Sequence, residues 1–145
     1  MLFVASDHAG FELKTKILSE LKGKTPFEDL GTHSQESCDY PLFAKLVAEK
    51  VGAHPEGLGL LICGSGIGMS IAANKFKGIR AACVSEPQSA ALSRQHNNAN
   101  ILCLGARILD LKTAMECLSA FLKAQIDTSS PRHQRRLDQI SSFEK

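Results

Sequence analysis

The sequence lacks cysteine pairs at any spacing that indicates a disulfide framework or a metal site. It has five cysteines, an odd number, and none belongs to a Cys-x-x-Cys motif. A disulfide scaffold or a zinc site is therefore not expected, and we predict free thiols in a reducing cytoplasm. For all but the second we expect a buried thiol or one without a role. The five are Cys38, Cys63, Cys83, Cys103 and Cys117.

Long hydrophobic runs and an excess of one charge are also missing. The opening stretch MLFVASDHAG turns polar too early for a secretion signal, and no later run approaches the length of a membrane span. With 17 Lys and Arg against 15 Asp and Glu, neither nucleic acid nor a membrane is expected as a partner. No repeat or linker divides the 145 residues, which predicts a single domain over 1–145.

What is present is an alternation of strand-like and helix-like segments. Strands are predicted at 2–5, 26–30, 58–63, 79–84 and 101–104, the second at a sheet edge because it begins with proline. Helices are predicted at 11–22, from 40, at 69–76, 86–95 and 111–125, and from 131. The second helix is expected to carry the apolar residues Phe43, Leu46 and Val47, with Val51 as a further candidate. This order predicts a doubly wound α/β domain with five parallel strands between helical layers.

Polar side chains gather where the predicted elements end. They occupy 6–10 after the first strand, 63–68 after the third, 96–97 at the end of the fourth helix and 105–107 after the fifth strand. In parallel α/β sheets, ligands bind beyond the carboxyl ends of the strands. We therefore expect several of these residues to form the functional site.

The segment 63–68 combines a cysteine with a glycine-rich turn. Gly64, Gly66 and Gly68 allow backbone N–H groups to turn toward an anion, and the following helix adds its positive end. The spacing matches neither GxGxxG nor a P-loop, and glycines here also suit a tight strand–helix turn. Cys63 lies where a helix N-terminus favours a thiolate, which supports a functional interpretation.

Other candidates have simpler explanations when taken singly. A histidine at a helix C-terminus, such as His96, is favourable without any function. Arg132 and Arg136 are spaced i,i+4 and share a helix face, which is often only a solvated basic surface.

The ordered set of motifs nevertheless resembles the ribose-5-phosphate isomerase B family, which includes the galactose-6-phosphate isomerase subunits. The resemblance extends over nearly the whole chain. It implies a Rossmann-like three-layer sandwich with a C-terminal helix. The matching stretches are SDHAGFELK (6–14), DLGTHS (29–34), DYP (39–41), ICGSGIGMSIAANK (62–75), GIRAA (78–82), SRQHNNAN (93–100), LGAR (104–107) and RHQRR (132–136).

The resemblance implies an aldose–ketose isomerase of the pentose phosphate pathway that uses neither metal nor cofactor. The resemblance implies that Cys63 is the base that moves a proton between C1 and C2. Some relatives have a cysteine at this position, and the others lack it and carry Glu just after the glycine loop. This chain has Cys63 and, at the later position, Met69, so it belongs to the cysteine kind. His96 would open the sugar ring. Ser65 stands where many relatives have Thr, and it keeps the hydroxyl. Binding of the enediolate oxygens is implied for Gly64, Gly66, Ile67, Gly68 and Asn97.

The remaining implied contacts hold the sugar and its phosphate. Asp7 would bind hydroxyl groups, and Tyr40 would line the pocket. Phosphate binding is implied for His8, Arg107, Arg132 and Arg136. A homodimer or homotetramer with shared active sites is expected.

Two alternatives stay open at this point. One is an isomerase of allose 6-phosphate or galactose 6-phosphate, with the same chemistry on a longer sugar. The other is a regulator of the same fold that binds phosphate without catalysis.

Overall fold

The computed structural model describes residues 1–145 as five strands and six helices. The strands are β1 (Leu2–Ser6), β2 (Phe27–Asp29), β3 (Leu58–Cys63), β4 (Ala81–Cys83) and β5 (Ile101–Gly105). The helices are α1 (Phe11–Leu21), α2 (Tyr40–Ala53), α3 (Ile67–Ala73), α4 (Pro87–Asn97), α5 (Leu111–Lys123) and α6 (Pro131–Ser142). None of the helices is long and apolar enough to cross a bilayer.

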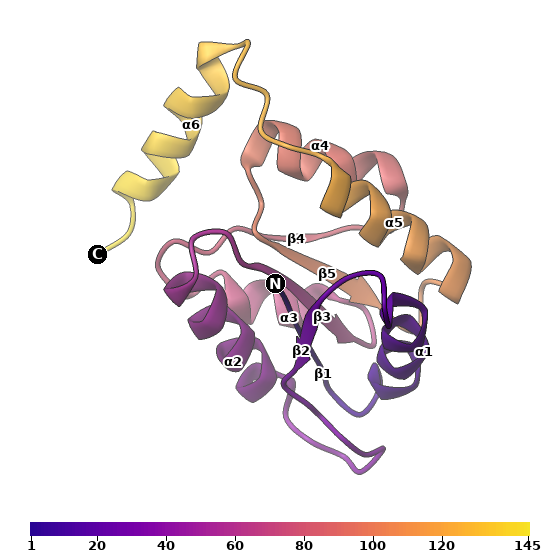
Figure 1. Cartoon of the computed structure of the whole chain (residues 1–145). Helices are drawn as coiled ribbons and strands as arrows, with labels where there is room; N and C mark the ends of the chain where they lie inside the picture. The colour runs from indigo at the N-terminus through magenta and orange to yellow at the C-terminus, as the bar shows by residue number, and fades with distance from the viewer.

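The strands form one parallel sheet in the order β2-β1-β3-β5-β4, which confirms the predicted five-stranded α/β fold and the edge position of β2. Successive side chains of a strand point to opposite faces. Leu60 and Ile62 therefore pack against α1, α4 and α5, whereas Leu61 and Cys63 pack against α2 and α3. The sheet is covered on both faces (Figure 1), so the molecule has three layers.

Two predicted boundaries were wrong because side chains compete with regular pairing. The strand predicted at 79–84 is shorter, since the Arg80 N–H donates to the side chain of Asn100 and not to a neighbouring strand. The helix predicted at 69–76 begins earlier and ends at Ala73, where Asn74 instead bonds the backbone of Ala81 on β4. On α2, Val47 and Val51 are buried, whereas Leu46 is 42% exposed.

Helix α6 stands apart from the layered body (Figure 1). It buries only His133 and Leu137, and the chain after it returns to the turn before β4, where Glu144 accepts a hydrogen bond from the Gly78 N–H at 2.8 Å. The helix therefore follows the edge of the sheet at which the strands begin.

Candidate active site

Cys63 ends β3 beneath the glycine-rich loop. Its side chain is 4% exposed, and its Sγ accepts a hydrogen bond from the Gly66 N–H at 3.2 Å. Gly66 has a φ of +79°, which a residue with a side chain rarely adopts, and it directly precedes α3. The backbone therefore aims a donor at the sulfur, and such a donor stabilises negative charge there.

Of three further predicted residues, Tyr40 and Arg107 contact this loop and Ser65 lies within it. A Cβ on Gly68 would lie only 2.6 Å from Cζ of Tyr40, so the tyrosine ring packs directly against the backbone there. The exposed Ser65 hydroxyl accepts a bond from the Ile67 N–H at 3.2 Å, within the loop. Arg107 is joined to the loop by its own N–H, which donates to the Gly64 carbonyl at 2.9 Å.

Asp7 and His8 follow β1, the neighbour of β3, and therefore reach the same edge. Asp7 is buried, its N–H donates to the Ile62 carbonyl at 3.2 Å, and its Oδ1 accepts from the Gly10 N–H at 3.0 Å. The Cys38 N–H donates to Nδ1 of His8 at 3.2 Å. In the neutral ring the proton is then on Nε2, which leaves a donor for a ligand oxygen.

A buried lysine, which sequence reasoning did not single out, fixes the loop beside these residues. Lys14 is 1% exposed, and its Nζ lies 2.5 Å from Oδ1 of Asp29 and 2.7 Å from the Thr32 carbonyl. The Ser6 N–H in turn donates to the Gly31 carbonyl at 2.8 Å. Lys14 lies within the SDHAGFELK motif, but its distant partners are visible only in the folded chain.

Two other thiols lie near Cys63 on the same face of the sheet. Cys103 is fully buried, which raises its pKa well above the ordinary value, with the charges of Cys83 and Cys63 adding to the effect. Burial also raises the pKa of Cys83, followed by the charge of Cys63. Cys83 lies exposed on the edge strand β4, so of the two expected alternatives, a buried thiol or one without a role, burial does not apply to it.

His96 and Asn97 lie at the other end of the strands from Cys63, the end at which the strands begin. Helix α4 follows β4 and runs back against the strand direction, so its last turn ends where the strands begin. The Gly59 N–H donates to the Asn100 carbonyl at 2.8 Å, which places this turn beside the start of β3. Cys63 lies four residues further along β3, roughly 13 Å at the usual rise of a strand.

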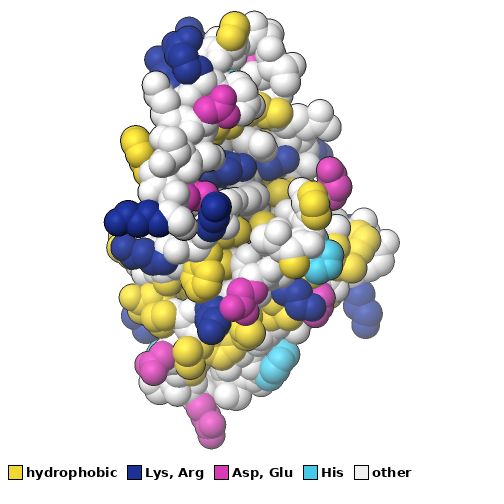
Figure 2. Space-filling model, turned by 90° about the vertical axis from the view of Figure 1, so that its left-hand side faces the viewer, with side chains coloured by type: hydrophobic (Ala, Val, Ile, Leu, Met, Phe, Trp, Pro, Cys, Tyr) yellow, Lys and Arg dark blue, Asp and Glu magenta, His cyan; other side chains and the backbone are white.

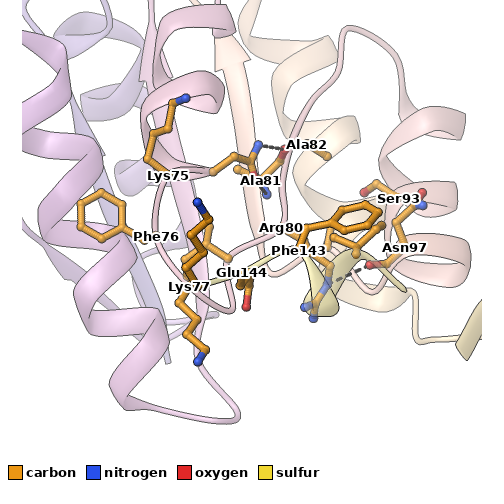
Figure 3. Close-up of a pocket in the computed structure, with 15 residues that line it drawn as sticks. Lys75, Phe76, Lys77, Arg80, Ala81, Ala82, Ser93, Asn97, Phe143 and Glu144 are labelled. Carbon is orange, nitrogen blue, oxygen red and sulfur yellow. Dashed lines mark hydrogen bonds between the residues drawn. The ribbon is translucent and has the colours of Figure 1, made fainter. Parts of the chain in front are cut away.

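Two arginines hold this end of α4. Nε of Arg80 donates to the Asn97 carbonyl at 3.0 Å (Figure 3) and to the Asn98 carbonyl at 3.1 Å. Arg94 donates to the Ala99 carbonyl at 2.7 Å, and its guanidinium lies over the Phe121 ring. Burial lowers the pKa of both arginines. The two cations satisfy carbonyl groups at the negative end of the helix dipole.

The residues predicted to bind phosphate form two groups, one at each end of the strands. His8 and Arg107 lie with Cys63, whereas Arg132 and Arg136 are exposed on α6, which packs on α4 through His133. Between α6 and the body is a cavity of about 700 Å³ (Figure 3). Arg80, Asn97, Phe143 and Glu144 contribute to its lining, and Cys63 does not. One chain therefore carries two separate halves of the predicted site.

The site offers no obvious metal centre. No group of three or more His, Cys, Asp or Glu side chains is arranged to hold a metal ion.

Known proteins resemble the chain over almost its full length. Ribose-5-phosphate isomerase B of Escherichia coli is 47% identical over 95% of this chain and 92% of its own. The Clostridium thermocellum ribose-5-phosphate isomerase B structure has a TM-score of 0.94 and 43% identity, covering 99% of this chain and 96% of its own.

A further solved structure contains a bound sugar phosphate. It is ribose-5-phosphate isomerase B of Mycoplasma genitalium with ribulose 5-phosphate, with a TM-score of 0.93 and 46% identity over 99% of this chain and 95% of its own. The sequence pattern of the Ribose/Galactose Isomerase family matches residues 2–140. The resemblance inferred from the motifs is thereby confirmed: the chain belongs to the ribose/galactose isomerase family.

Proposed function

We propose that this protein interconverts ribose 5-phosphate and ribulose 5-phosphate, with Cys63 as the base. The observation that carries the proposal is the Cys63 sulfur under a glycine-rich loop, with the Gly66 N–H directed at it. Removing a proton next to a carbonyl creates an enediolate, whose negative charge requires preorganised donors. The same loop provides a base and backbone donors at neighbouring positions.

The reaction begins with a closed ribose ring, which must open before a proton can move. His96 serves as the acid–base group for opening, because an imidazole exchanges protons near neutral pH. The Cys63 thiolate then takes the proton from C2 of the open aldose and returns it to C1. The proton on the 2-oxygen moves to the 1-oxygen, and the Ser65 hydroxyl is the group placed on the loop to pass it. Asn97 joins the loop amides around these oxygens.

The phosphate and hydroxyl groups of the substrate need their own contacts. The free Nε2–H of His8 and the Arg107 guanidinium lie on the Cys63 side, and Arg132 and Arg136 supply two further cations from α6. Arginine forks match phosphate oxygens well. Asp7 binds the sugar hydroxyls, and Tyr40 covers the loop at Gly68.

A homodimer follows from the division of the site between two edges of one sheet. In a twofold dimer, the Cys63 edge of one chain meets the His96 edge of its partner, so that two complete sites form. In Figure 2, hydrophobic side chains are spread over one face of the molecule, with Lys and Arg gathered in its hollow. Several large apolar side chains are exposed on α2, on α3 and at the end of α6. They are Leu42, Ile67, Ile71, Ile140 and Phe143. Larger exposed apolar patches mark interaction surfaces. A homotetramer built from such dimers keeps the same sites.

The five free cysteines support a cytoplasmic location, where thiols stay reduced.

The test is a panel of five- and six-carbon aldose phosphates, assayed with and without EDTA. We expect turnover of ribose 5-phosphate that EDTA does not change. Preferred turnover of allose 6-phosphate or galactose 6-phosphate would show that the substrate is a six-carbon sugar phosphate. Binding of ribose 5-phosphate without formation of ribulose 5-phosphate would instead indicate a regulator.

A further inference from the structure

Two histidines from different helices stack at the carboxyl end of α4. The ring centroids of His96 and His133 lie 4.5 Å apart, and the ring planes differ by 13°. His96 is exposed, whereas His133 is 5% exposed, so the second ring covers one face of the first from inside. We propose that His133 is a positioning residue that fixes the His96 imidazole for ring opening, an inference that rests on the function proposed above.

The position of His133 is itself fixed by the chain around it. His133 and Leu137, one turn apart, form the buried face of α6. The Asp127 N–H donates to the Gln95 carbonyl at 2.8 Å, which ties the segment before α6 to the residue next to His96. The Asp127 carboxylate lies 3.9 Å from Nε2 of His133. The stack is therefore anchored on both sides and is not a chance contact of two surface rings.

The groups around His133 disfavour the protonated form of its ring. The groups facing His133 are His96 from α4, Asp127 from the preceding segment, and Arg132 and Arg136 from α6 itself. Burial lowers the pKa of His133, the three positive groups lower it further, and only Asp127 opposes them. The lowered pKa favours an uncharged His133 ring at neutral pH, and ring opening remains the proposed role of His96.

Covering one face of His96 restricts the orientations that its ring can adopt. Ring opening requires a proton donor within hydrogen-bond reach of the ring oxygen, and positioning errors near 1 Å can cost about 100-fold in rate. A neutral aromatic ring gives this support without adding a second charge beside the phosphate-binding arginines.

The test separates ring opening from proton transfer by using both directions of the reaction. Ribulose 5-phosphate cannot form a five-membered ring, because its 5-oxygen carries the phosphate. Exchange of its C1 proton with D₂O therefore reports proton transfer alone. The variants are His133→Ala, which removes the ring, and His133→Phe, which keeps a flat ring. Gln134→Ala is the control on the exposed side of α6.

We expect His133→Ala to lower kcat for ribose 5-phosphate by about 10- to 100-fold, with KM and C1 exchange within about threefold of wild type. His133→Phe should recover most of the lost rate and show the same pH–rate profile as wild type. Gln134→Ala should match wild type. Thermal unfolding of each variant identifies any general loss of structure.

Wild-type conversion by His133→Ala would overturn the inference, as would equal losses in conversion and exchange. Failure of His133→Phe to recover the rate, or a pH–rate profile different from that of wild type, would give His133 a proton-exchanging role instead of a positioning one. His96→Asn is measured alongside. If His96→Asn is impaired and His133→Ala is not, only this inference fails. Unimpaired His96→Asn would refute the ring-opening role itself.

Discussion

At the scale of single residues, the thiol group proposed as the base differs from its neighbours by one backbone contact. Cys63 receives the Gly66 N–H, whereas Cys83 donates weakly to the Ser65 carbonyl at 3.7 Å. Burial raises the pKa of Cys83 and Cys103, so these two keep their protons. The charge of Cys63 raises the pKa of both thiols further. The Gly66 N–H therefore distinguishes Cys63 from the other two thiols on this face of the sheet.

The first prediction concerns this sulfur. Cys63→Ala should lower kcat for ribose 5-phosphate by about 10²- to 10⁴-fold, the usual effect of removing a general base. Cys117→Ala, which removes a buried thiol packed between α5 and the other face of the sheet, should keep wild-type kcat. Steady-state assays of both variants decide the matter. Near-wild-type turnover by Cys63→Ala would assign the base to another group.

A second prediction separates Cys63 from His96. Erythrose 4-phosphate cannot close a five-membered ring, because its 4-oxygen carries the phosphate. His96→Asn should therefore cripple turnover of ribose 5-phosphate by about 10²-fold or more and largely spare erythrose 4-phosphate. The comparison requires that wild type accept the shorter sugar at a measurable rate. Equal losses on both sugars would give His96 a part in the proton transfer itself.

Some of these residues were predictable from sequence and others were not. Cys63 and the glycine loop are adjacent in the chain, so a strand followed by a glycine-rich turn already indicates their environment. The stack of His133 on His96 and the pairing of Lys14 with Asp29 join residues from different elements. No local pattern predicts which distant side chain a buried histidine or lysine will contact.

At the scale of elements, α6 carries cations that the layered body does not need for its packing. Its buried face is limited to His133 and Leu137, and the arginines lie exposed on other faces. The sequence predicted where this helix begins, because Pro131 suits the first turn. It did not predict that the helix stands apart, because that depends on how the segment after α5 attaches to Gln95.

The third prediction uses the arginines of α6. Arg132→Ala and Arg136→Ala should each raise KM for ribose 5-phosphate, since a charge-assisted contact contributes about 1.5–3 kcal/mol. Arg135→Ala removes the same charge beside Gln134 and Asp138 on the outer surface and should leave KM unchanged. Initial-rate kinetics of the three variants provide the comparison. Equal KM values in all three variants would mean that Arg132 and Arg136 form only a solvated basic face and do not bind the phosphate.

At the scale of the whole molecule, topology decides what one chain can do alone. A helix that follows a parallel strand must return to the edge where the strands begin, so His96 at its end cannot share an edge with Cys63. The alternation of elements predicted the sheet, and the motifs supplied the candidate site residues. Their division between two edges became clear only from the direction of α4. The account therefore requires a second chain to complete each site.

Complementation between two inactive variants tests this requirement most directly. Cys63→Ala and His96→Asn are co-expressed, purified together and assayed with ribose 5-phosphate. If each site takes Cys63 from one chain and His96 from the other, half of the dimers are mixed, and each mixed dimer has one intact site. The mixture should then recover about a quarter of wild-type activity. Cys63→Ala with Asp7→Asn, two changes on the same edge, should recover none. Activity of the first mixture no higher than that of the separate variants would contradict the account.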